Sequence, residues 1–570
     1  MAATDKLHLY EDGLPDSATN LWHFHGGLHL PGHKHLSSEQ PIAACAAVDR
    51  YVIPLQQHIG VAGDLLVAKG ERVLKGQMLT RPKTLISASV HAPVSGMIED
   101  IGPQPVPHPS GISGTCITLL NDYEDEWVEH EPVAEHFTRM SSHQLRGLIQ
   151  DAGIVGLGGA AFPSAMKETE IGIDTLIVNG VECEPYITCD DRLMRERAAD
   201  IIEGVRIVAH IVKAKTCIIA IEDNKPEATA AMEAALKEDD NGLIRVKSVP
   251  TLYPSGGERQ LIEVLTGEEV PSNGLPADIH VLCHNVATCY AVYRAVFKAE
   301  PLISRIVTIT GHGVAQPRNL EVPIGTPIAA CIEQCGGYSE DAVSLIMGGP
   351  MMGITLDNDR LPIIKACNCL LVTTADDLSL PSSEKHMPCI RCGLCVDVCP
   401  AQLLPQQLYW HSASRNLERA LAYSLFDCIE CGCCAYVCPS KIPLVQYYRF
   451  AKSEVWDQER QRKKADIARE RHEHRVARLE KQQRERDERL RKKRDALKKN
   501  KVGRDVELDK KKAAIAEALA RVQKKKADSG IEPKNTEQLT AEQQKKIREA
   551  DLRRSGIKTR PADNTEQDNP

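Results

Sequence analysis

The chain has 570 residues, of which 42% are hydrophobic and 26% charged, with 38 glycines and 33 prolines. This length predicts several domains, and the ordinary composition excludes collagen-like, mucin-like and wholly disordered proteins. The formal net charge of -8 divides unevenly, because residues 451–570 carry 36 Lys and Arg against 24 Asp and Glu, a net +12, which leaves -20 for residues 1–450. An acidic body disfavours nucleic-acid binding, which needs clustered cations.

Residues 1–40 are expected to form an N-terminal arm. No apolar stretch in the chain reaches the roughly 20 residues needed to cross a bilayer, and the N-terminus has no signal-peptide core. All 20 cysteines precede residue 439, which favours a reducing compartment and metal ligation over disulfides. The histidines of this arm are dense enough to suggest a zinc tract, and they are His23, His25, His29, His33 and His35. The stretch from Gly26 to His29 resembles a Gly-Gly-x-His stretch of a known protein family, and this resemblance favours a docked arm instead.

Residues 41–125 are predicted to form a barrel sandwich similar to lipoyl domains. Short apolar runs alternate with glycine turns at Gly70, Gly76 and Gly96, the last within Ala-Pro-Val-Ser-Gly. Lys83 lies near the position of a lipoylated lysine, but the residues that usually flank such a lysine are missing. A structural barrel is therefore favoured over a lipoyl carrier.

Residues 135–300 are predicted to form an α/β layer with a largely parallel sheet, because strands and helices alternate. Ser141 or Ser142 begins a helix that ends at Gly153. Gly156, Gly158 and Ala161 then match G-x-G-x-x-A, but a helix precedes them, which argues against a nucleotide-binding Rossmann turn. The expected strands are 174–179, 216–221 and 243–249, and the expected helices are 190–213, 226–237 and 257–265.

Residues 380–450 contain two copies of C-x2-C-x2-C-x3-C-P, the ligand pattern of two-cluster ferredoxins. Three thiolates from one turn hold a 4Fe-4S cluster, and the fourth cysteine of each run ligates the other cluster. Structural zinc sites rarely place three cysteines so closely. The spacing therefore assigns Cys389, Cys392, Cys395 and Cys438 to one cluster, and Cys428, Cys431, Cys434 and Cys399 to the other.

Leucines at helical spacing between the two runs favour an α-helical ferredoxin domain over the compact β type. Cys433, which is off the ligand spacing, and the pair Cys367 and Cys369 are expected to be packed thiols. Residues 451–570 are dense in Arg, Lys and Glu, and predict a charged helical tail with disorder at 561–570. A solvated helix is one interpretation of this tail, and docking of its cations onto an anionic membrane face or a partner subunit is the other.

Four separated motifs and both cysteine runs carry a family resemblance over about residues 20–450. The motifs begin at Gly156, Asn179, Tyr253 and His284, and they resemble the flavin-carrying, NADH-oxidising subunit of respiratory complex I. Their order resembles still more closely the C subunits of Rnf-type ion-translocating electron transport complexes. The expected fold is therefore multidomain α/β, with a lipoyl-like barrel sandwich, a Rossmann-like flavin domain, a soluble-ligand-binding β-grasp domain at 301–375 and an α-helical two-cluster ferredoxin domain.

The resemblance implies non-covalent FMN in the glycine-rich crevice, with NADH as its substrate. Backbone N–H groups of the glycine segment, together with a lysine, are suited to holding the FMN phosphate. The implied residues are Gly156, Gly158, Gly159 and Lys167 for the phosphate, Asn179, Asn285 and Thr288 for the ribityl chain and flavin ring, Phe162 for the NADH adenine, and Glu182, Glu184 and Glu258 for the nicotinamide and the dinucleotide hydroxyls.

The resemblance further implies a peripheral subunit on the cytoplasmic side of a bacterial inner membrane, in a complex that couples electron transfer to ion movement. Flavin is needed there because a nicotinamide carries two electrons together whereas each 4Fe-4S cluster carries one. The implied partners are other subunits of the complex and, at the far end of the electron path, ferredoxin or flavodoxin.

Three positions depart from the complex I pattern: Leu157 replaces an Arg, Val181 an Asp and Ala287 a Glu. These departures bear on the NADH geometry more than on flavin binding. Two further interpretations therefore stay open. One is a soluble NADH dehydrogenase or hydrogenase diaphorase with the same flavin domain, and the other is an electron-relay or redox-regulatory protein without its own NADH site.

Overall fold

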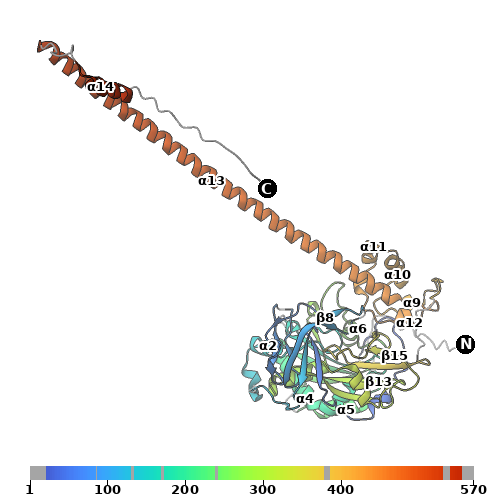
Figure 1. Ribbon diagram of the computed structural model, residues 1–570. Coiled ribbons are helices and arrows are strands. Elements are labelled where there is room, and N and C mark those ends of the chain that lie inside the picture. The colour runs from blue at the N-terminus through green and yellow to red at the C-terminus, as the bar shows by residue number, and fades with distance from the viewer. Residues whose placement is uncertain are drawn as a thin grey trace. The chain divides into compact units, whose positions relative to one another are not determined.

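The computed structural model describes residues 21–84, 86–108, 110–129, 132, 134–168, 172–237, 242–377, 386–530 and 539–554. The first half of the expected arm and the predicted disorder at 561–570 lie outside these residues. The chain forms two units, one up to Glu459 and one from Arg460 onward, and each is described by itself (Figure 1). Within the described ranges, no helix is both long enough and apolar enough to cross a membrane.

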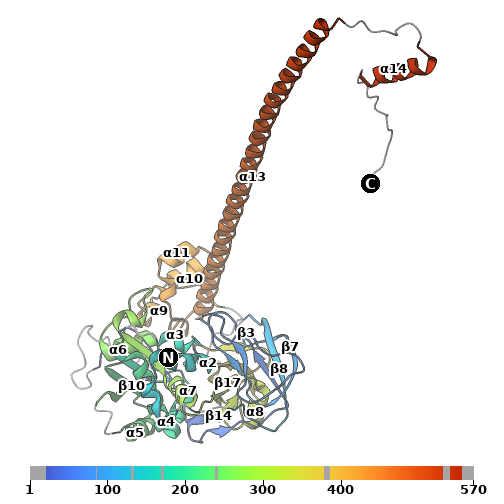
Figure 2. The same ribbon diagram turned by 90° about the vertical axis from the view of Figure 1, so that its left-hand side faces the viewer.

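Two antiparallel sheets form a barrel sandwich from strands β2 (Arg50–Pro54), β3 (Asp64–Leu65), β4 (Arg72–Val73), β5 (Met78–Arg81), β6 (Val90–His91), β7 (Gly96–Pro105) and β8 (Ser113–Asn121). The strand orders are β2-β8-β7-β4 and β3-β5-β6, and Figure 2 shows the long strands β7 and β8 side by side. The two sheets share one apolar core, which includes Tyr51, Leu79 and Leu119. Lys83, the residue considered for lipoylation, forms an exposed ion pair with Asp64 at 2.9 Å.

A four-stranded parallel sheet forms the α/β layer, in the order β11-β10-β9-β12, which confirms the predicted parallel pairing. In β9, Leu176 and Val178 join the core with α4 and α7, whereas Ile177 joins the core with α6. Side chains buried on both faces are typical of a parallel sheet covered by helices on both sides. The elements are α2 (Ser142–Asp151), α3 (Ser164–Lys167), β9 (Thr175–Gly180), α4 (Cys189–Val212), β10 (Thr216–Glu222), α5 (Pro226–Ala234), β11 (Ile244–Val249), α6 (Glu258–Thr266), β12 (Val281–Asn285) and α7 (Val286–Phe297), with 3-10 turns η1 (Ala134–Arg139) and η3 (Pro276–Ile279).

A six-stranded mixed sheet follows, with the order β1-β14-β13-β17-β15-β16. Its edge strand β1 comes from the first residues of the segment predicted for the barrel sandwich, and it pairs in parallel with β14. Cys367 and Cys369 are buried in this region, as expected. The elements are α1 (His35–Ser38) in the arm, β1 (Ala43–Ala44), β13 (Ser304–Thr310), β14 (Arg318–Pro323), α8 (Ile328–Gln334), β15 (Ala342–Met347), β16 (Ile354–Leu356) and β17 (Cys369–Thr374).

The cysteine-rich segment, which is described from residue 386 onward, contains helices and turns but no strand, so the α-helical prediction is confirmed. Its core buries Leu408, Tyr448 and Ala451, the last two from the first turns of α13. From Arg460 onward the described side chains of α13 are exposed, as the charge pattern predicts. The elements are α9 (Leu394–Asp397), α10 (Pro405–Ala413), α11 (Leu417–Ala422), η4 (Leu425–Asp427), α12 (Cys433–Tyr436), α13 (Leu444–Asp528) and α14 (Ala541–Arg554).

Candidate functional site

The glycine-rich segment forms a tight loop whose backbone is fixed by hydrogen bonds to buried side chains. Its ends meet where the Gly156 N–H donates to the Phe162 carbonyl at 2.8 Å. Leu157 is buried: its N–H donates to the Thr288 hydroxyl at 2.9 Å, and its carbonyl accepts from the Arg305 guanidinium at 2.9 Å. Residues 158–160, in contrast, are exposed. The loop therefore presents its glycines outward, as a phosphate cradle requires.

Two asparagines lie at the carboxyl edge of the parallel sheet, opposite each other in the register of β9 and β12. The Asn179 amide donates to the Gly256 carbonyl at 2.8 Å, and the Asn285 amide donates to the Asp190 carboxylate at 2.6 Å. A Cβ on Gly158 would come within 3.3 Å of the Asn285 Cβ, so the glycine allows this close approach. The structure thus brings all the flavin motifs to the edge where open parallel sheets bind ligands.

Lys167, at the end of α3, forms an ion pair with Glu258 in the first turn of α6, with Nζ and Oε1 2.6 Å apart. Burial disfavours the ammonium, but the Glu258 carboxylate outweighs that effect and raises the pKa of Lys167. The side chains stay 30% and 38% exposed, so both can be reached from solvent. The two residues that were predicted to contact different parts of the cofactors therefore bind each other.

Beside this ion pair lie two buried groups that the sequence reasoning missed as a pair, Glu168 and His284, 3.6 Å apart. Burial raises the pKa of Glu168 to about 8. Burial, followed by the charge of Lys167, lowers the pKa of His284 to about 3. Both groups are therefore uncharged at neutral pH, so the charges at this point of the structure are those of the Lys167–Glu258 ion pair.

The acidic motif holds loops together. The Glu182 carboxylate accepts the N–H of Asp190 at 2.7 Å at the start of α4, and the Glu184 carboxylate accepts the N–H of Met351 at 2.7 Å. Lys34, from the arm, donates to the main-chain carbonyls of both glutamates at 2.6 and 2.9 Å. The second Glu182 oxygen accepts the N–H of Asp191 at 3.3 Å, so both oxygens of Glu182 and one of Glu184 already accept hydrogen bonds within the protein. Their predicted role toward a dinucleotide stays a prediction.

A further buried cluster joins Glu182, Cys189 and Asp190, whose possible ligating atoms all lie within 4.8 Å of one another. The cations Lys34 and Lys225 lie near enough to lower the pKa of Glu182, but burial outweighs them and raises it to about 8. The cluster therefore forms part of the packing at the start of α4.

The two predicted cysteine sets are brought together across the two runs. Cys389, Cys392, Cys395 and Cys438 line one cavity of about 280 Å³. Cys428, Cys431, Cys434 and Cys399 line a second, much smaller one of about 20 Å³, together with the packed thiol of Cys433. This is the crossed arrangement that the spacing predicts, with the fourth cysteine of each run beside the other run.

The backbone of the two runs repeats at an offset of 39 residues. Each run has the same three positions of positive φ, one before and one after the second cysteine and one beyond the fourth. The short helices α9 and α12 are offset in the same way. The paired positions are Arg391 and Glu430, Gly393 and Gly432, and Gln402 and Lys441.

The surroundings of the two runs differ. Cys392 is exposed, and so is its neighbour Ile390, which is 67% exposed. Cys431 is buried, and its carbonyl accepts a hydrogen bond from the Tyr253 hydroxyl at 2.7 Å. A Cβ on Gly432 would come within 2.9 Å of the Met351 carbonyl. The second run therefore packs against the flavin motifs, whereas the first faces solvent.

The arm docks over this contact. A Cβ on Gly26 would meet the Val398 carbonyl carbon at 2.6 Å, and Leu28 pairs with Tyr253 in an antiparallel bridge. His25 and His29 bond the main-chain carbonyls of Cys399 and Thr251 at 3.0 and 3.1 Å. The arm is therefore docked, as the sequence analysis favoured.

Known protein families match successive parts of the chain. The Nuo51 FMN-binding domain family matches residues 149–294, the RnfC barrel sandwich hybrid domain 22–124, the SLBB domain 306–355 and the 4Fe-4S dicluster domain 388–442. The C subunit of the ion-translocating oxidoreductase complex of Serratia proteamaculans is 44% identical over 94% of this chain and 75% of its own length. This chain belongs to the RnfC family. The resemblance inferred from the motifs is thereby confirmed.

Two further RnfC relatives come from Vibrio cholerae El Tor, 45% identical, and Edwardsiella ictaluri, 48% identical, over 90% and 82% of this chain. The chain spans 66% and 58% of the lengths of these relatives. A solved NAD+-reducing [NiFe]-hydrogenase aligns with 57% of this chain and 65% of its own at 19% identity and a TM-score of 0.41, too remote to support an argument.

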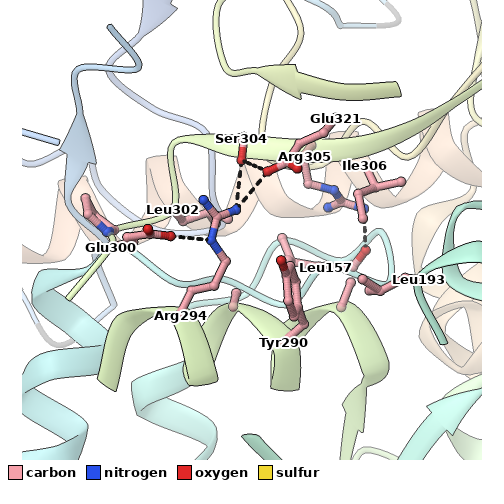
Figure 3. Close-up of a pocket in the computed structure, with 13 residues that line it drawn as sticks. Leu157, Leu193, Tyr290, Arg294, Glu300, Leu302, Ser304, Arg305, Ile306 and Glu321 are labelled. Atoms are coloured by element: carbon pink, nitrogen blue, oxygen red, sulfur yellow. Dashed lines mark hydrogen bonds and ion pairs between the residues drawn. The ribbon is translucent and has the colours of Figure 1, made fainter. Parts of the chain in front are cut away.

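A pocket next to the glycine loop of this RnfC chain is lined by two of the residues that depart from the complex I pattern (Figure 3). It lies between α7 and β13, is lined by Leu157 and Ala287, and has a volume of about 30 Å³. Arg294 within it is neutralised by Glu300 at 2.8 Å and Glu321 at 3.0 Å. Such a space holds about one water and no flavin. Leu157 and Ala287 therefore line an internal seam on the side of the loop away from the exposed glycines.

Proposed function

We propose that this chain is the NADH-oxidising electron-transport subunit of a membrane-bound, ion-translocating oxidoreductase complex. FMN supplies the exchange of a hydride pair for single electrons, and two 4Fe-4S clusters relay those electrons to other subunits. Family membership supports an electron-transport subunit, and the flavin and dicluster matches support both kinds of cofactor. As a peripheral subunit it would lie on the cytoplasmic side of a bacterial inner membrane, with ferredoxin or flavodoxin at the far end of the path.

The contact between the flavin motifs and the second cysteine run carries this proposal. Tyr253 belongs to one motif and bonds the carbonyl of Cys431 directly at 2.7 Å. Glu184 belongs to another motif and holds Met351, whose carbonyl lies against Gly432. Electrons leaving the crevice would therefore cross packed protein to reach the second run, without passing through solvent.

The burial of the two runs gives the relay an order. The set of Cys428, Cys431, Cys434 and Cys399 would hold the inner cluster, next to the flavin. The set of Cys389, Cys392, Cys395 and Cys438 would hold the outer cluster, since Cys392 is exposed. An exposed cluster is suited to exchanging electrons with another protein, and a buried one to receiving them from a cofactor in the same chain.

The residues at the sheet edge fit a flavin phosphate at one end and a ring at the other. Gly158 and Gly159 are exposed on a loop that Thr288 and Arg305 fix through Leu157. Lys167 would neutralise the phosphate by exchanging Glu258 for it. Asn179 and Asn285 would orient the ribityl chain and ring, and Gly156, Phe162, Glu182 and Glu184 would complete the predicted site for FMN and NADH.

The finer domain assignment belongs to the same proposal. We assign residues 1–40 to the arm, 41–125 to the barrel sandwich, 135–300 to a Rossmann-like flavin domain, 301–375 to a β-grasp domain, 380–450 to the cluster domain and 451–570 to the tail. The four-stranded parallel sheet supports the Rossmann-like assignment, and the six-stranded mixed sheet supports the β-grasp assignment.

Anaerobic purification followed by iron, sulfide and flavin analysis tests the cofactors, and a stopped-flow NADH titration tests the relay. About eight iron atoms and one FMN per chain are expected, with the flavin absorbance bleaching before the cluster absorbance. Eight iron atoms without flavin, and no response to NADH after FMN is added, would refute the NADH-oxidising function.

That outcome would favour a second candidate, an electron-relay protein without its own NADH site. The observation behind it is that Leu157 and Val181 are 3% and 0% exposed, packed in the cores on either side of the sheet. Neither side chain can contact a dinucleotide in this position. In that case the clusters would still be reduced by dithionite and not by NADH.

A further inference from the structure

One continuous face of α13 combines exposed apolar side chains with cations and has no acidic residue. A helix turns by about 100° per residue, so steps of three or four residues stay on one face. Such steps lead from Gln461 to Lys526 within the described part of the helix. Along this path, which we call the tail face, the larger apolar residues are Val476, Leu479, Leu490, Leu497, Leu508 and Ile515, followed by Leu519 and Val522.

These apolar side chains are unusually exposed for their size. Leu490 is 48% exposed and Leu497 is 68% exposed, and the others from Leu479 to Val522 fall between these values. Leucines 18 residues apart, such as Leu479 and Leu497 or Leu490 and Leu508, span five whole turns of a straight helix. The stripe therefore runs parallel to the helix axis and does not wind around it, so a flat surface can meet it along its whole length.

The charges of the tail face all have one sign. The path from Gln461 to Lys526 includes no Asp or Glu, and its cations are Arg486, Arg494, Lys501, Arg504, Lys512 and Lys526. The opposite path, from Lys463 to Asp528, includes six carboxylates among its cations: Glu470, Glu485, Glu488, Asp495, Glu517 and Asp528. The opposite path therefore supplies the acidic partners of pairs such as Lys492–Glu488 and Arg521–Glu517, which stabilise the helix in water. Other carboxylates, such as Asp487 and Asp505, flank the tail face without lying on it.

We infer that the tail face binds an anionic lipid bilayer surface. A stripe of leucines between cations suits a plane of headgroups, where the cations meet phosphates and the apolar side chains enter the acyl boundary. A second copy of the same helix fits poorly, because pairing two tail faces would place cations against cations in a sequence with no acidic residue there to compensate. The inference does not depend on the proposed electron transfer, since it rests on the second unit alone.

Two matched variants of the full chain test the face. The face variant combines Arg494→Glu, Lys501→Glu, Arg504→Glu and Lys512→Glu. The control variant makes the same change of net charge on the opposite path, in the overlapping stretch 481–510, with Lys481→Glu, Lys492→Glu, Lys499→Glu and Lys510→Glu. The two variants therefore have equal net charge and differ mainly in the face that carries the substitutions.

Binding is measured by co-sedimentation with vesicles of phosphatidylcholine alone or with about 30 mol% phosphatidylglycerol, at about 50 mM salt. The unmodified chain is expected to bind the anionic vesicles and not the neutral ones. The face variant should lose at least about tenfold in apparent affinity and the control less than about twofold. Equal losses in both variants would overturn the inference. Failure of the unmodified chain to bind anionic vesicles would also overturn it, whether or not the chain binds RNA or an acidic protein.

A third variant, the apolar variant, removes apolar side chains from the tail face, so that weaker binding cannot be explained by a loss of charge or of helix. Leu490→Ala, Leu497→Ala, Leu508→Ala and Ile515→Ala keep every charge and use a strong helix former. This variant should also bind anionic vesicles more weakly, whereas Ile467→Ala with Val506→Ala, which lie off the face, should not. Unchanged vesicle binding in the apolar variant would overturn the inference that the tail face enters the bilayer, and would indicate a tail that binds through its charges alone. Circular dichroism checks helix content, and NADH bleaching of the flavin separates this test from that of the proposed function.

Discussion

Replacing Lys365 by Met tests how the domains are joined around the flavin segment. The Lys365 ammonium is buried and donates to the carbonyls of Ser89, in the barrel sandwich, at 2.7 Å and of Gly153, at the end of α2, at 2.6 Å. Its main-chain N–H donates to the Gln57 side chain at 3.0 Å. Burial lowers the pKa of Lys365 from 10.5 to about 7. A neutral amine keeps two N–H donors, which is enough for both carbonyls.

The sign of the pH dependence follows from this lowered pKa of Lys365. In the unfolded chain the lysine titrates near 10.5, so between pH 7 and 10.5 the unfolded state binds more protons and the free energy of unfolding rises with pH. Below pH 7 both states are charged and the dependence ends. At about 1.4 kcal/mol for each pH unit of difference, the whole window corresponds to about 5 kcal/mol at most.

Thermal unfolding of the wild type and Lys365→Met is compared from pH 7 to about pH 9.5. The wild type should gain about 3 kcal/mol relative to the variant over this range. Lys83→Met, which removes an exposed lysine of the barrel sandwich, should leave the pH dependence unchanged. Parallel curves for the wild type and Lys365→Met would refute the neutral amine and indicate a lysine that stays charged in the fold.

Three further predictions concern the cofactors. Glu258→Gln should tighten FMN binding by about two- to fivefold in a fluorescence titration, because a half-exposed ion pair that competes for Lys167 is worth about 0.2–1 kcal/mol; weaker binding would instead make Glu258 a ligand. Cys392→Ser and Cys431→Ser should each leave about four of about eight iron atoms. NADH should reduce the remaining cluster rapidly only in Cys392→Ser, which keeps the inner cluster, and equal stopped-flow rates in the two variants would contradict the proposed order of inner and outer clusters. Tyr253→Phe leaves the Cys431 carbonyl without its donor, so thermal unfolding should show a loss of about 1–3 kcal/mol at unchanged iron content; unchanged stability would show that the bond contributes little.

Local patterns were sufficient to predict the elements of the α/β layer. The strand expected at 216–221 is β10 (Thr216–Glu222), and the helix expected at 190–213 is α4 (Cys189–Val212). The expected helix 226–237 ends three residues early, in α5 (Pro226–Ala234). Apolar periodicity and turn residues act over a few residues, so they fix the elements and leave their ends uncertain.

Contacts between distant segments were not predictable in the same way. Strand β1 joins the edge of a sheet whose other strands begin more than two hundred residues later in the chain. Arg305 and Thr288 hold the backbone of Leu157, although nothing near Leu157 in the sequence indicates either residue. Asn179 and Asn285 meet at one sheet edge because parallel strands end there together, a placement that the sequence analysis did not state. The bonding partners of the motif residues, such as Met351 for Glu184, follow only from the packing of separate domains.

The two cysteine runs show the same limit within one domain. Equal spacing gives both runs the same backbone, but the residue before the second cysteine is Arg391 in one and Glu430 in the other. Arg391 lies over the ring of Trp410, 5.1 Å from its centroid, at the exposed run. Glu430 instead pairs with Lys452 at 2.8 Å, and Lys452 donates to the Cys428 carbonyl at 2.6 Å. Charge near a cluster tunes its potential, so the two proposed clusters would meet different charges, Glu430 with Lys452 at one run and Arg391 at the other, although their ligand spacing is the same.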